Sequence, residues 1–224
     1  MGLAKSHLIS YPRSRNHAIR TILEYSSKRP TLGCPGTGKS DQPIYMRPAN
    51  QEDIIQIESA VPVAYKSHFP HQVLHWEKNV VDDMRILFIT RDPMKSIFSN
   101  VYRHFGRKLL YSTHQVEKLV QKEIDNYLGL IYMFCALNNR PRLHVKFENI
   151  FSEDPAVSLE TINNMVEFVD PSAPQLTLRD LKIVFNLSKE SQQSLSSLKK
   201  HRLELLIKKA IESHVNYKEC LTYI

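Results

Sequence analysis

The chain has 224 residues, of which 42% are hydrophobic and 24% are charged; this composition is typical of a globular protein and excludes a collagen, a coiled coil and an intrinsically disordered chain. The length predicts one domain over residues 1–224, large enough to bury a full core. A net charge of +7 favours anionic partners such as nucleotides, sulfated compounds, nucleic acid or acidic membranes, although excess charge also serves solubility alone.

Hydrophobic periodicity predicts strands that alternate with helices along the chain. In chain order the expected elements are a strand at 8–11, a helix from residue 18, a surface loop at 30–50, a strand at 61–65, a strand at 85–90, a helix at 94–103, a helix at 114–137, a strand at 144–147, a helix at 159–169 and a basic helix at 195–214. This order indicates an α/β fold with a mainly parallel central sheet flanked by helices. The strand at 85–90 contains the continuous apolar run Ile86-Leu-Phe-Ile89, as in a parallel strand that is buried on both faces.

The cysteines predict neither a disulfide framework nor a zinc site, because only Cys34, Cys135 and Cys220 are present and none forms a CxxC pair. We expect reduced thiols, with Cys135 in a buried helix and the other two in a loop or tail. The longest nearly unbroken apolar run covers residues 127–137, whereas a membrane span needs about twenty residues. The first residues show no apolar stretch of a secretory signal. A cytoplasmic protein without a membrane span is therefore expected.

Residues 33–40, Gly-Cys-Pro-Gly-Thr-Gly-Lys-Ser, match the nucleotide-binding pattern GxxxxGK[ST]. The pattern binds phosphate only between a buried strand and a helix N-terminus. Residues 26–31 before it are too polar for a core strand, and Pro43 interrupts the helix that should follow. We therefore do not expect this loop to be the nucleotide site, but an ATP- or GTP-dependent P-loop enzyme that uses Lys39 stays the alternative function.

A second loop, at residues 10–17, has the setting that the first one lacks. A strand precedes it, a helix follows it, and it contains Arg13, Ser14, Arg15 and Asn16. Helix N-terminal amides and two guanidinium groups together would form an anion site. A helix N-cap with exposed basic side chains would use the same residues, and this loop alone leaves both interpretations open.

Four segments together resemble the sulfotransferases that use 3′-phosphoadenosine 5′-phosphosulfate. Residues 10–17 resemble the family's phosphosulfate loop, a Tyr-Pro-Lys/Arg-Ser-Gly pattern followed by Thr or Asn, and residues 66–68 resemble its Lys-Thr-His segment. Residues 91–99 are similar to its second signature, in which an Arg and a Ser eight residues later bind the 3′-phosphate. Residues 145–155 resemble, more weakly, its Tyr-Glu-Asp-Leu strand and the following helix. The matches follow the family's order and span about three quarters of the chain, from residue 8 to about residue 169.

The resemblance implies a P-loop-like three-layer fold and the transfer of a sulfuryl group to a hydroxyl or amine without a metal. It implies His68 as the general base, a role for which a pKa near neutrality is suited. Lys66 and Arg13 would stabilise the transferred group and the leaving phosphate. The residues that would bind the donor, 3′-phosphoadenosine 5′-phosphosulfate, are Arg13, Ser14, Arg15, Asn16, His17, Arg91 and Ser99.

The chain departs from the family's pattern at three places. Arg15 stands where the family has the loop glycine, and Ala18 replaces an aromatic residue that often stacks on adenine. The adenine would then lie against another group, such as Phe147 or a residue of the 30–50 loop. The family's C-terminal basic loop has no clean counterpart; Lys199-Lys200-His201-Arg202 could add positive charge to the 3′-phosphate or form a solvated helix face.

No motif identifies the acceptor. A basic surface suits an anionic glycan, but small alcohols and lipids fit the sequence as well. A third hypothesis is a nucleic-acid-binding module without catalysis, which would bind polynucleotides in a salt-sensitive manner. The chain lacks the interleaved aromatic and basic residues of such modules, so a small-molecule or glycan acceptor is the expected partner. The oligomeric state is not indicated.

Overall fold

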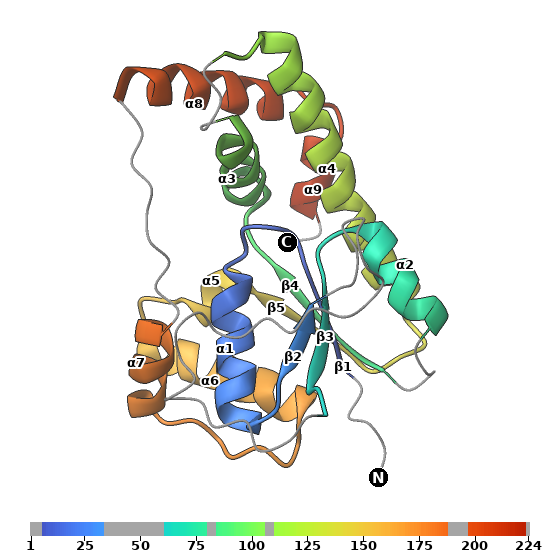
Figure 1. The fold of residues 1–224 in the computed structure, drawn as a ribbon, viewed down its shortest axis with the longest axis vertical. Coiled ribbons are helices and arrows are strands. Elements are labelled where there is room, and N and C mark those ends of the chain that lie inside the picture. Colours follow the sequence, from blue (N-terminus) through green and yellow to red (C-terminus); the bar gives the residue numbers. More distant parts are fainter. Residues whose placement is uncertain (1–5, 34–60, 80–83, 106–109, 188–196, 223–224) are drawn as a thin grey trace.

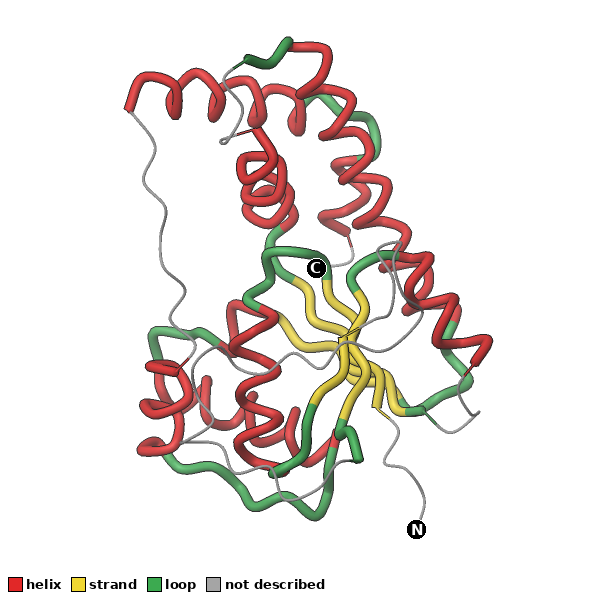
Figure 2. The backbone as a smooth tube through the Cα atoms, in the orientation of Figure 1, coloured by secondary structure: helices red, strands yellow, loops and turns green. Residues whose placement is uncertain are grey.

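The computed structural model describes residues 6–33, 61–79, 84–105, 110–187 and 197–222. Its described strands form one five-stranded sheet in the order β2-β3-β1-β4-β5, shown edge-on among the helices in Figures 1 and 2. The strands are β1 (Ser6–Ser10), β2 (Thr31–Gly33), β3 (Ala64–Ser67), β4 (Arg85–Thr90) and β5 (Arg142–Lys146). Every neighbouring pair is parallel, which confirms the predicted α/β fold.

Helices cover both faces of the sheet and so form a three-layer structure (Figure 1). The core on one face includes residues of α1, α5, α6 and α7, and the core on the other includes residues of α2, α3, α4, α8 and α9, where α8 packs on α3 and α4 and α9 packs on α4. The helices are α1 (Asn16–Ser27), α2 (Pro70–Asn79), α3 (Pro93–Phe105), α4 (Thr113–Ala136), α5 (Phe147–Ile150), α6 (Pro155–Val169), α7 (Leu178–Leu187), α8 (Ser197–Glu212) and α9 (Tyr217–Thr222).

Strand β4 shows why the sequence predicts a buried parallel strand. Ile86 and Phe88 belong to the core beneath α3 and α4, whereas Leu87 and Ile89 belong to the core beneath α1 and α6. Successive side chains of a strand point to opposite faces, so a strand covered on both sides favours apolar residues at successive positions. The predicted bounds of this strand, 85–90, are confirmed.

The order of the strands places a switch point at β1, the middle strand. The chain leaves β1 for β2 through α1 on one face, and it passes from β3 to β4 through α2 on the other face. Right-handed crossovers that run in opposite directions must use opposite faces. Open α/β sheets bind ligands beyond the carboxyl ends of the strands at such a point, so the carboxyl end of β1 is where a ligand is expected.

The predicted surface loop at 30–50 is wrong at its start, because Thr31–Gly33 form the buried strand β2 and pair with β3. Arg20 of α1 donates hydrogen bonds to the Thr31 hydroxyl and carbonyl, each at 2.6 Å. The Glu24 carboxylate accepts the Thr31 N–H at 2.8 Å. These contacts from α1 stabilise a strand that the local sequence does not predict. A strand does precede the GxxxxGKS string, and residues 34–40 of that string lie outside the described residues.

The cysteine environments differ from the prediction. Cys135 is exposed although α4 has a buried side, because residues such as Val120, Ile124 and Ile131 form the packed face. Cys220 of α9 is buried in the core beneath α4. Within the described residues, no helix combines the length and apolar character needed to cross a membrane.

Candidate active site

The loop between β1 and α1 has an unusual backbone. Arg13 and Arg15 have φ angles of 69° and 43°, in the left-handed region, whereas Ser14 between them does not. This region costs a residue other than glycine about 1–2 kcal/mol. Alternation of left-handed and ordinary residues turns successive N–H groups towards one side, as in the concave anion-binding turns of phosphate sites. The position at which the resemblance expects glycine, Arg15, is thus held in a glycine-like conformation.

Three buried polar atoms near this loop have no hydrogen-bond partner among the described residues. They are Ser14 Oγ, Asn16 Oδ1 and Arg91 Nε; the Ser14 side chain is fully buried. Buried polar atoms are nearly always paired in folded proteins. Two donor atoms without a partner among the described residues, Ser14 Oγ and Arg91 Nε, beside a strained turn fit a bound anion.

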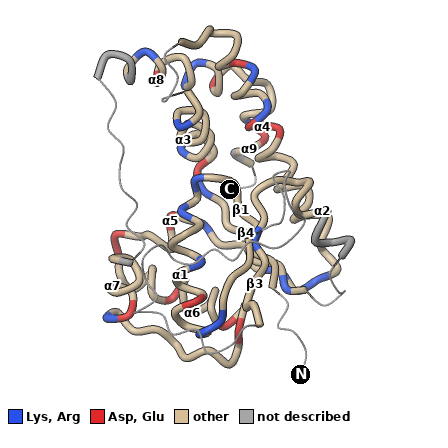
Figure 3. The backbone as a smooth tube through the Cα atoms, in the orientation of Figure 1, with Lys and Arg blue, Asp and Glu red and all other residues tan. Residues whose placement is uncertain are grey.

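The structure joins the two basic loops that the sequence predicts from separate motifs. Arg13 Nε donates a hydrogen bond to Ser99 Oγ on α3 at 3.2 Å, and Arg91 Nη1 donates to the Arg13 carbonyl at 2.6 Å. Figure 3 shows basic residues on the chain between α3 and α1, where these loops lie. The loops after β1 and β4 therefore form one site at the carboxyl edge of two adjacent strands.

The electrostatics of this site favour an anion. Burial lowers the pKa of Arg91, and the nearby guanidinium groups of Arg15 and Arg13 lower it further, while the Glu148 carboxylate opposes them. A lowered guanidinium pKa means that the positive charge is poorly stabilised by its surroundings. An anion bound between these groups would relieve the repulsion.

Aromatic rings line the side of the site next to α5. The guanidinium of Arg91 lies 4.8 Å from the ring centre of Phe147, and that of Arg15 lies 5.2 Å from the ring centre of Phe151. The two rings pack at 4.6 Å from each other. Phe147, predicted as the last residue of a strand, instead begins α5, because β5 ends at Lys146.

His68 follows β3 and faces the end of β1. Its Nδ1 lies 2.8 Å from the Ser10 carbonyl, and a carbonyl only accepts, so Nδ1 holds the proton and Nε2 keeps a lone pair. The His68 backbone N–H donates to Gln72 Oε1 at 2.7 Å, and Asn16 Nδ2 lies 3.5 Å from Nδ1. Burial, followed by the Lys66 ammonium, holds the pKa of His68 well below its usual range. The imidazole is therefore neutral near pH 7, as a general base requires.

Lys66 and His17 lie near the same edge of the sheet, whereas the predicted basic residues of α8 belong to a helix that packs on α3 and α4. Lys66 is buried within β3 and is in register with Leu8 of β1, so it precedes the strand end rather than following it. His17 is exposed in the first turn of α1. On α8, His201 and Arg202 are exposed, as a solvated helix face would place them.

Helix α4 contributes contacts that the sequence analysis missed. Tyr11 donates a hydrogen bond to Glu123 Oε2 at 2.6 Å, and Tyr127 donates one to the Arg91 carbonyl at 2.7 Å. The available signal was a carboxylate and a tyrosine, four residues apart, on the apolar stripe of a helix. Nothing in the local sequence indicates their partners.

The described part of the chain contains no group of three or more His, Cys, Asp or Glu side chains that could hold a metal ion. Among solved structures the chain resembles mouse sulfotransferase SULT7A1 complexed with PAP, with a TM-score of 0.53 and 12% sequence identity over 100% of this chain and 90% of that chain. No protein-family model and no curated protein sequence matches the chain. The likeness establishes a sulfotransferase-like fold.

Proposed function

We propose that this protein is a sulfotransferase that uses 3′-phosphoadenosine 5′-phosphosulfate as its donor. One observation carries the proposal: the loops after β1 and β4 meet through the contacts of Arg13 with Ser99 and of Arg91 with the Arg13 carbonyl. A donor with phosphate groups at its 5′ and 3′ positions needs two adjoining anion pockets of this kind. The fold shared with a PAP-bound sulfotransferase supports the assignment.

The residues around the loops fit the two ends of the donor. Ser14, Asn16 and His17, with the N–H groups of the strained turn, would hold the 5′-phosphosulfate. Arg91 and Ser99 would hold the 3′-phosphate, and the Phe147 ring beside Arg91 offers a flat apolar surface to the adenine. When bound, the donor supplies an activated sulfuryl group.

His68 acts as the general base in this proposal. Its free Nε2 accepts the proton of the acceptor hydroxyl or amine, while the Ser10 carbonyl holds the ring through Nδ1. Lys66 supplies positive charge beside the imidazole and raises the share of its neutral form. Arg13, at the junction of the two loops, stabilises negative charge that develops on the leaving phosphate. No step requires a metal.

The acceptor is a hydroxyl or amine of a small molecule or a glycan. The positive net charge favours an acceptor that is already anionic, such as a sulfated or uronic glycan. Residence in the cytoplasm stays a prediction of the sequence.

The alternative P-loop enzyme gains one observation, because strand β2 ends at Gly33. Calorimetry with adenosine 3′,5′-bisphosphate, 5′-AMP, ATP with Mg²⁺ and a DNA oligomer separates the candidates. We expect the bisphosphate to bind most tightly, and transfer of labelled sulfate to a panel of alcohols, amines and glycans then identifies the acceptor. Preference for ATP with Mg²⁺, or salt-sensitive binding of DNA alone, would overturn the sulfotransferase proposal.

A further inference from the structure

We propose that Glu123 and Tyr127 of α4 are positioning residues that set the distance between the two donor loops. The inference rests on the proposed function, because it assigns one loop to each end of the donor. It concerns residues that do not themselves contact the donor: each acts through a loop residue to which it is hydrogen-bonded.

Glu123 holds the first loop. Its carboxylate is buried, with 6% of the residue exposed, and accepts the Tyr11 hydroxyl at 2.6 Å. Tyr11 directly precedes the turn that contains Arg13 and Ser14. Asn100, the neighbour of Ser99, donates to the same hydroxyl at 3.5 Å. The contact therefore attaches the base of the first anion loop to α4.

Tyr127 holds the second loop. Its hydroxyl donates to the Arg91 carbonyl at 2.7 Å, at the point where the chain leaves β4. Its ring also packs against that of Tyr11, with the centroids 5.2 Å apart. Tyr127 thus fixes the main chain from which the Arg91 side chain reaches the Arg13 carbonyl.

The two contacts share one rigid support. Residues four apart lie on the same face of a helix, so Glu123 and Tyr127 present their side chains side by side to adjacent loops. Ile124 and Leu128 on the same helix are buried in the core. Pro70 of α2 packs so closely against Gly129 that a Cβ there would lie 2.7 Å from its Cγ. These packing contacts hold helix α4 in position beside the loops at the carboxyl edge of the sheet.

Neither tyrosine loses its hydroxyl proton at ordinary pH. Burial raises the pKa of Tyr127, and burial together with the Glu123 carboxylate raises that of Tyr11 well above its usual value. Both hydroxyls remain donors. The spacing of the loops is then a fixed property of the fold, and it matters most for a ligand that contacts both loops at once.

Tyr127→Phe tests the second attachment with little disturbance of the core. Freeing the Arg91 loop should weaken adenosine 3′,5′-bisphosphate about five-fold, the value of one ordinary hydrogen bond, and change 5′-AMP by less than about two-fold because 5′-AMP lacks the 3′-phosphate. Tyr132→Phe is the matched control: it removes from the same helix a tyrosine hydroxyl that donates to Glu219 of α9. It should alter neither affinity.

Two variants of Glu123 test the first attachment. Glu123→Ala should weaken both ligands by the same factor of about five, because both use the 5′ loop. Glu123→Gln keeps an oxygen that can accept the Tyr11 hydroxyl and should restore affinity to within about two-fold of the native protein. Glu117→Gln, at an exposed position on α4, controls for the loss of a charge.

The measurement is calorimetric titration of each full-length variant with both ligands, with melting temperatures recorded in parallel. If Tyr127→Phe leaves the ratio of the two affinities unchanged, α4 does not set the loop spacing. If Glu123→Gln loses as much affinity as Glu123→Ala, charge and not the hydrogen bond is responsible, and the inference fails in that part. If the native protein does not prefer the bisphosphate over 5′-AMP, the proposed function itself fails, which is a separate outcome.

Discussion

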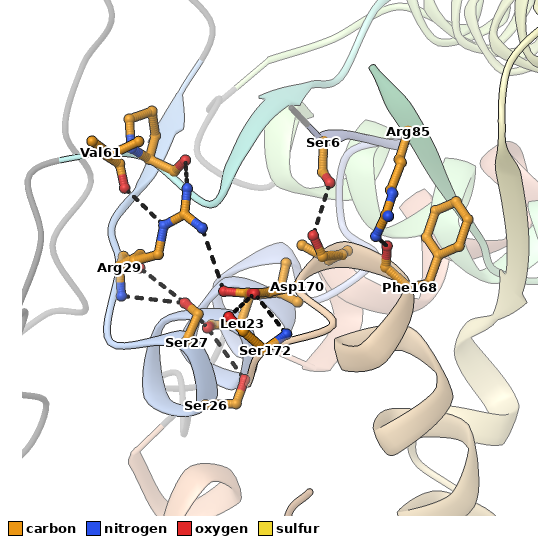
Figure 4. Close-up of polar contacts among 12 residues, drawn as sticks. Ser6, Leu23, Ser26, Ser27, Arg29, Val61, Arg85, Phe168, Asp170 and Ser172 are labelled. Carbon is orange, nitrogen blue, oxygen red and sulfur yellow. Dashed lines mark hydrogen bonds and ion pairs between the residues drawn. The ribbon is translucent and has the colours of Figure 1, made fainter. Parts of the chain in front are cut away.

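The two edges of the central sheet differ in how their polar groups are used. At the amino edge, where the strands begin, side chains form hydrogen bonds and an ion pair with carbonyl groups and with one another (Figure 4). Arg29 donates to the Val61 and Pro62 carbonyls at 3.2 and 2.9 Å and pairs with Asp170 at 3.4 Å. The further contacts are Ser6 Oγ to the Val169 carbonyl at 3.2 Å and Arg85 Nη1 to the Phe168 carbonyl at 2.8 Å.

The carboxyl edge keeps strain and unpaired polar atoms. Arg13 and Arg15 have left-handed backbones, and buried atoms of Ser14, Asn16 and Arg91 have no partner among the described residues. Strained conformations tend to gather at binding sites, where the rest of the fold stabilises them. The carboxyl edge therefore combines contacts that position its loops, such as those of Tyr11 and Tyr127, with polar atoms that are open to a ligand. The contacts of Arg29 at the amino edge hold elements of the fold together. Changes at the two edges should have opposite consequences for stability and activity.

The largest effect is expected from His68→Ala at the carboxyl edge. Loss of the base should lower kcat by about 10²–10⁴-fold, while the affinity for adenosine 3′,5′-bisphosphate stays within about three-fold because the imidazole serves the acceptor. Single-turnover transfer with labelled donor and calorimetry measure the two quantities. His71→Ala, an exposed histidine of α2, is the matched control. A variant with more than about a tenth of native kcat would show that His68 is not the base.

Arg91→Ala should change ligand preference by about a hundredfold. A hydrogen bond to a charged group contributes about 1.5–3 kcal/mol, and loss of the guanidinium also disturbs Ser99 through Arg13. The bisphosphate should therefore weaken far more than 5′-AMP. Equal losses for both ligands would mean that Arg91 supports the loop only, and the 3′-phosphate assignment would be wrong.

The pH dependence of the rate should reflect the environment of His68. Its pKa lies well below 6.5 because of burial and then the Lys66 charge, so the base stays neutral as the pH falls and kcat/KM should hold through pH 6.5. The rate then declines only as the pH passes the lowered pKa. Lys66→Met removes one cause and should shift this acidic limb to higher pH, whatever its effect on the maximal rate. If the acidic limb of the profile does not move, the Lys66 charge does not lower the pKa of His68.

A stability effect without loss of binding is expected from Arg29→Ala at the amino edge. Its guanidinium contacts two carbonyls and Asp170, and we expect the free energy of unfolding to fall by about 2 kcal/mol. For a chain of this size the melting temperature should drop by roughly 4–8 °C. Arg202→Ala, an exposed position on α8, is the control. Loss of bisphosphate affinity in folded Arg29→Ala would contradict the separation of the two edges.

The sequence predicts those parts of the fold that local pattern determines. Strand β4 is predicted with its bounds because burial on both faces favours a continuous apolar run, here Ile86 to Ile89, which Arg85 and Thr90 flank. Strand β2 is missed because its three residues are held by side chains of α1, namely Arg20 and Glu24. Contacts of this kind, made by side chains of another element, produce no hydrophobic periodicity in the sequence of the strand itself.

The candidate site divides in the same way. Arg13, Arg91 and His68 lie in short motifs directly after strands, so the sequence indicates each of them. The link of Tyr11 to Glu123 joins positions 112 residues apart, and only the fold brings them together. The left-handed backbone at Arg15 is indicated only by the resemblance, which has glycine at this position, since an arginine itself gives no local sign of a conformation that glycine prefers.

The smallest effect is expected from Lys39→Ala. This variant tests whether the anion binds to the loops after β1 and β4 or to the segment after β2. Strand β2 lies at the edge of the sheet, separated from β1 by β3, whereas the joined loops follow the adjacent strands β1 and β4. Pro43 still opposes a helix after the GxxxxGKS string. Affinity for the bisphosphate should therefore change by less than about three-fold, an effect below that of one ordinary hydrogen bond. Arg13→Ala, measured beside it, should weaken binding strongly; the reverse ranking would move the nucleotide site to β2 and favour the P-loop enzyme.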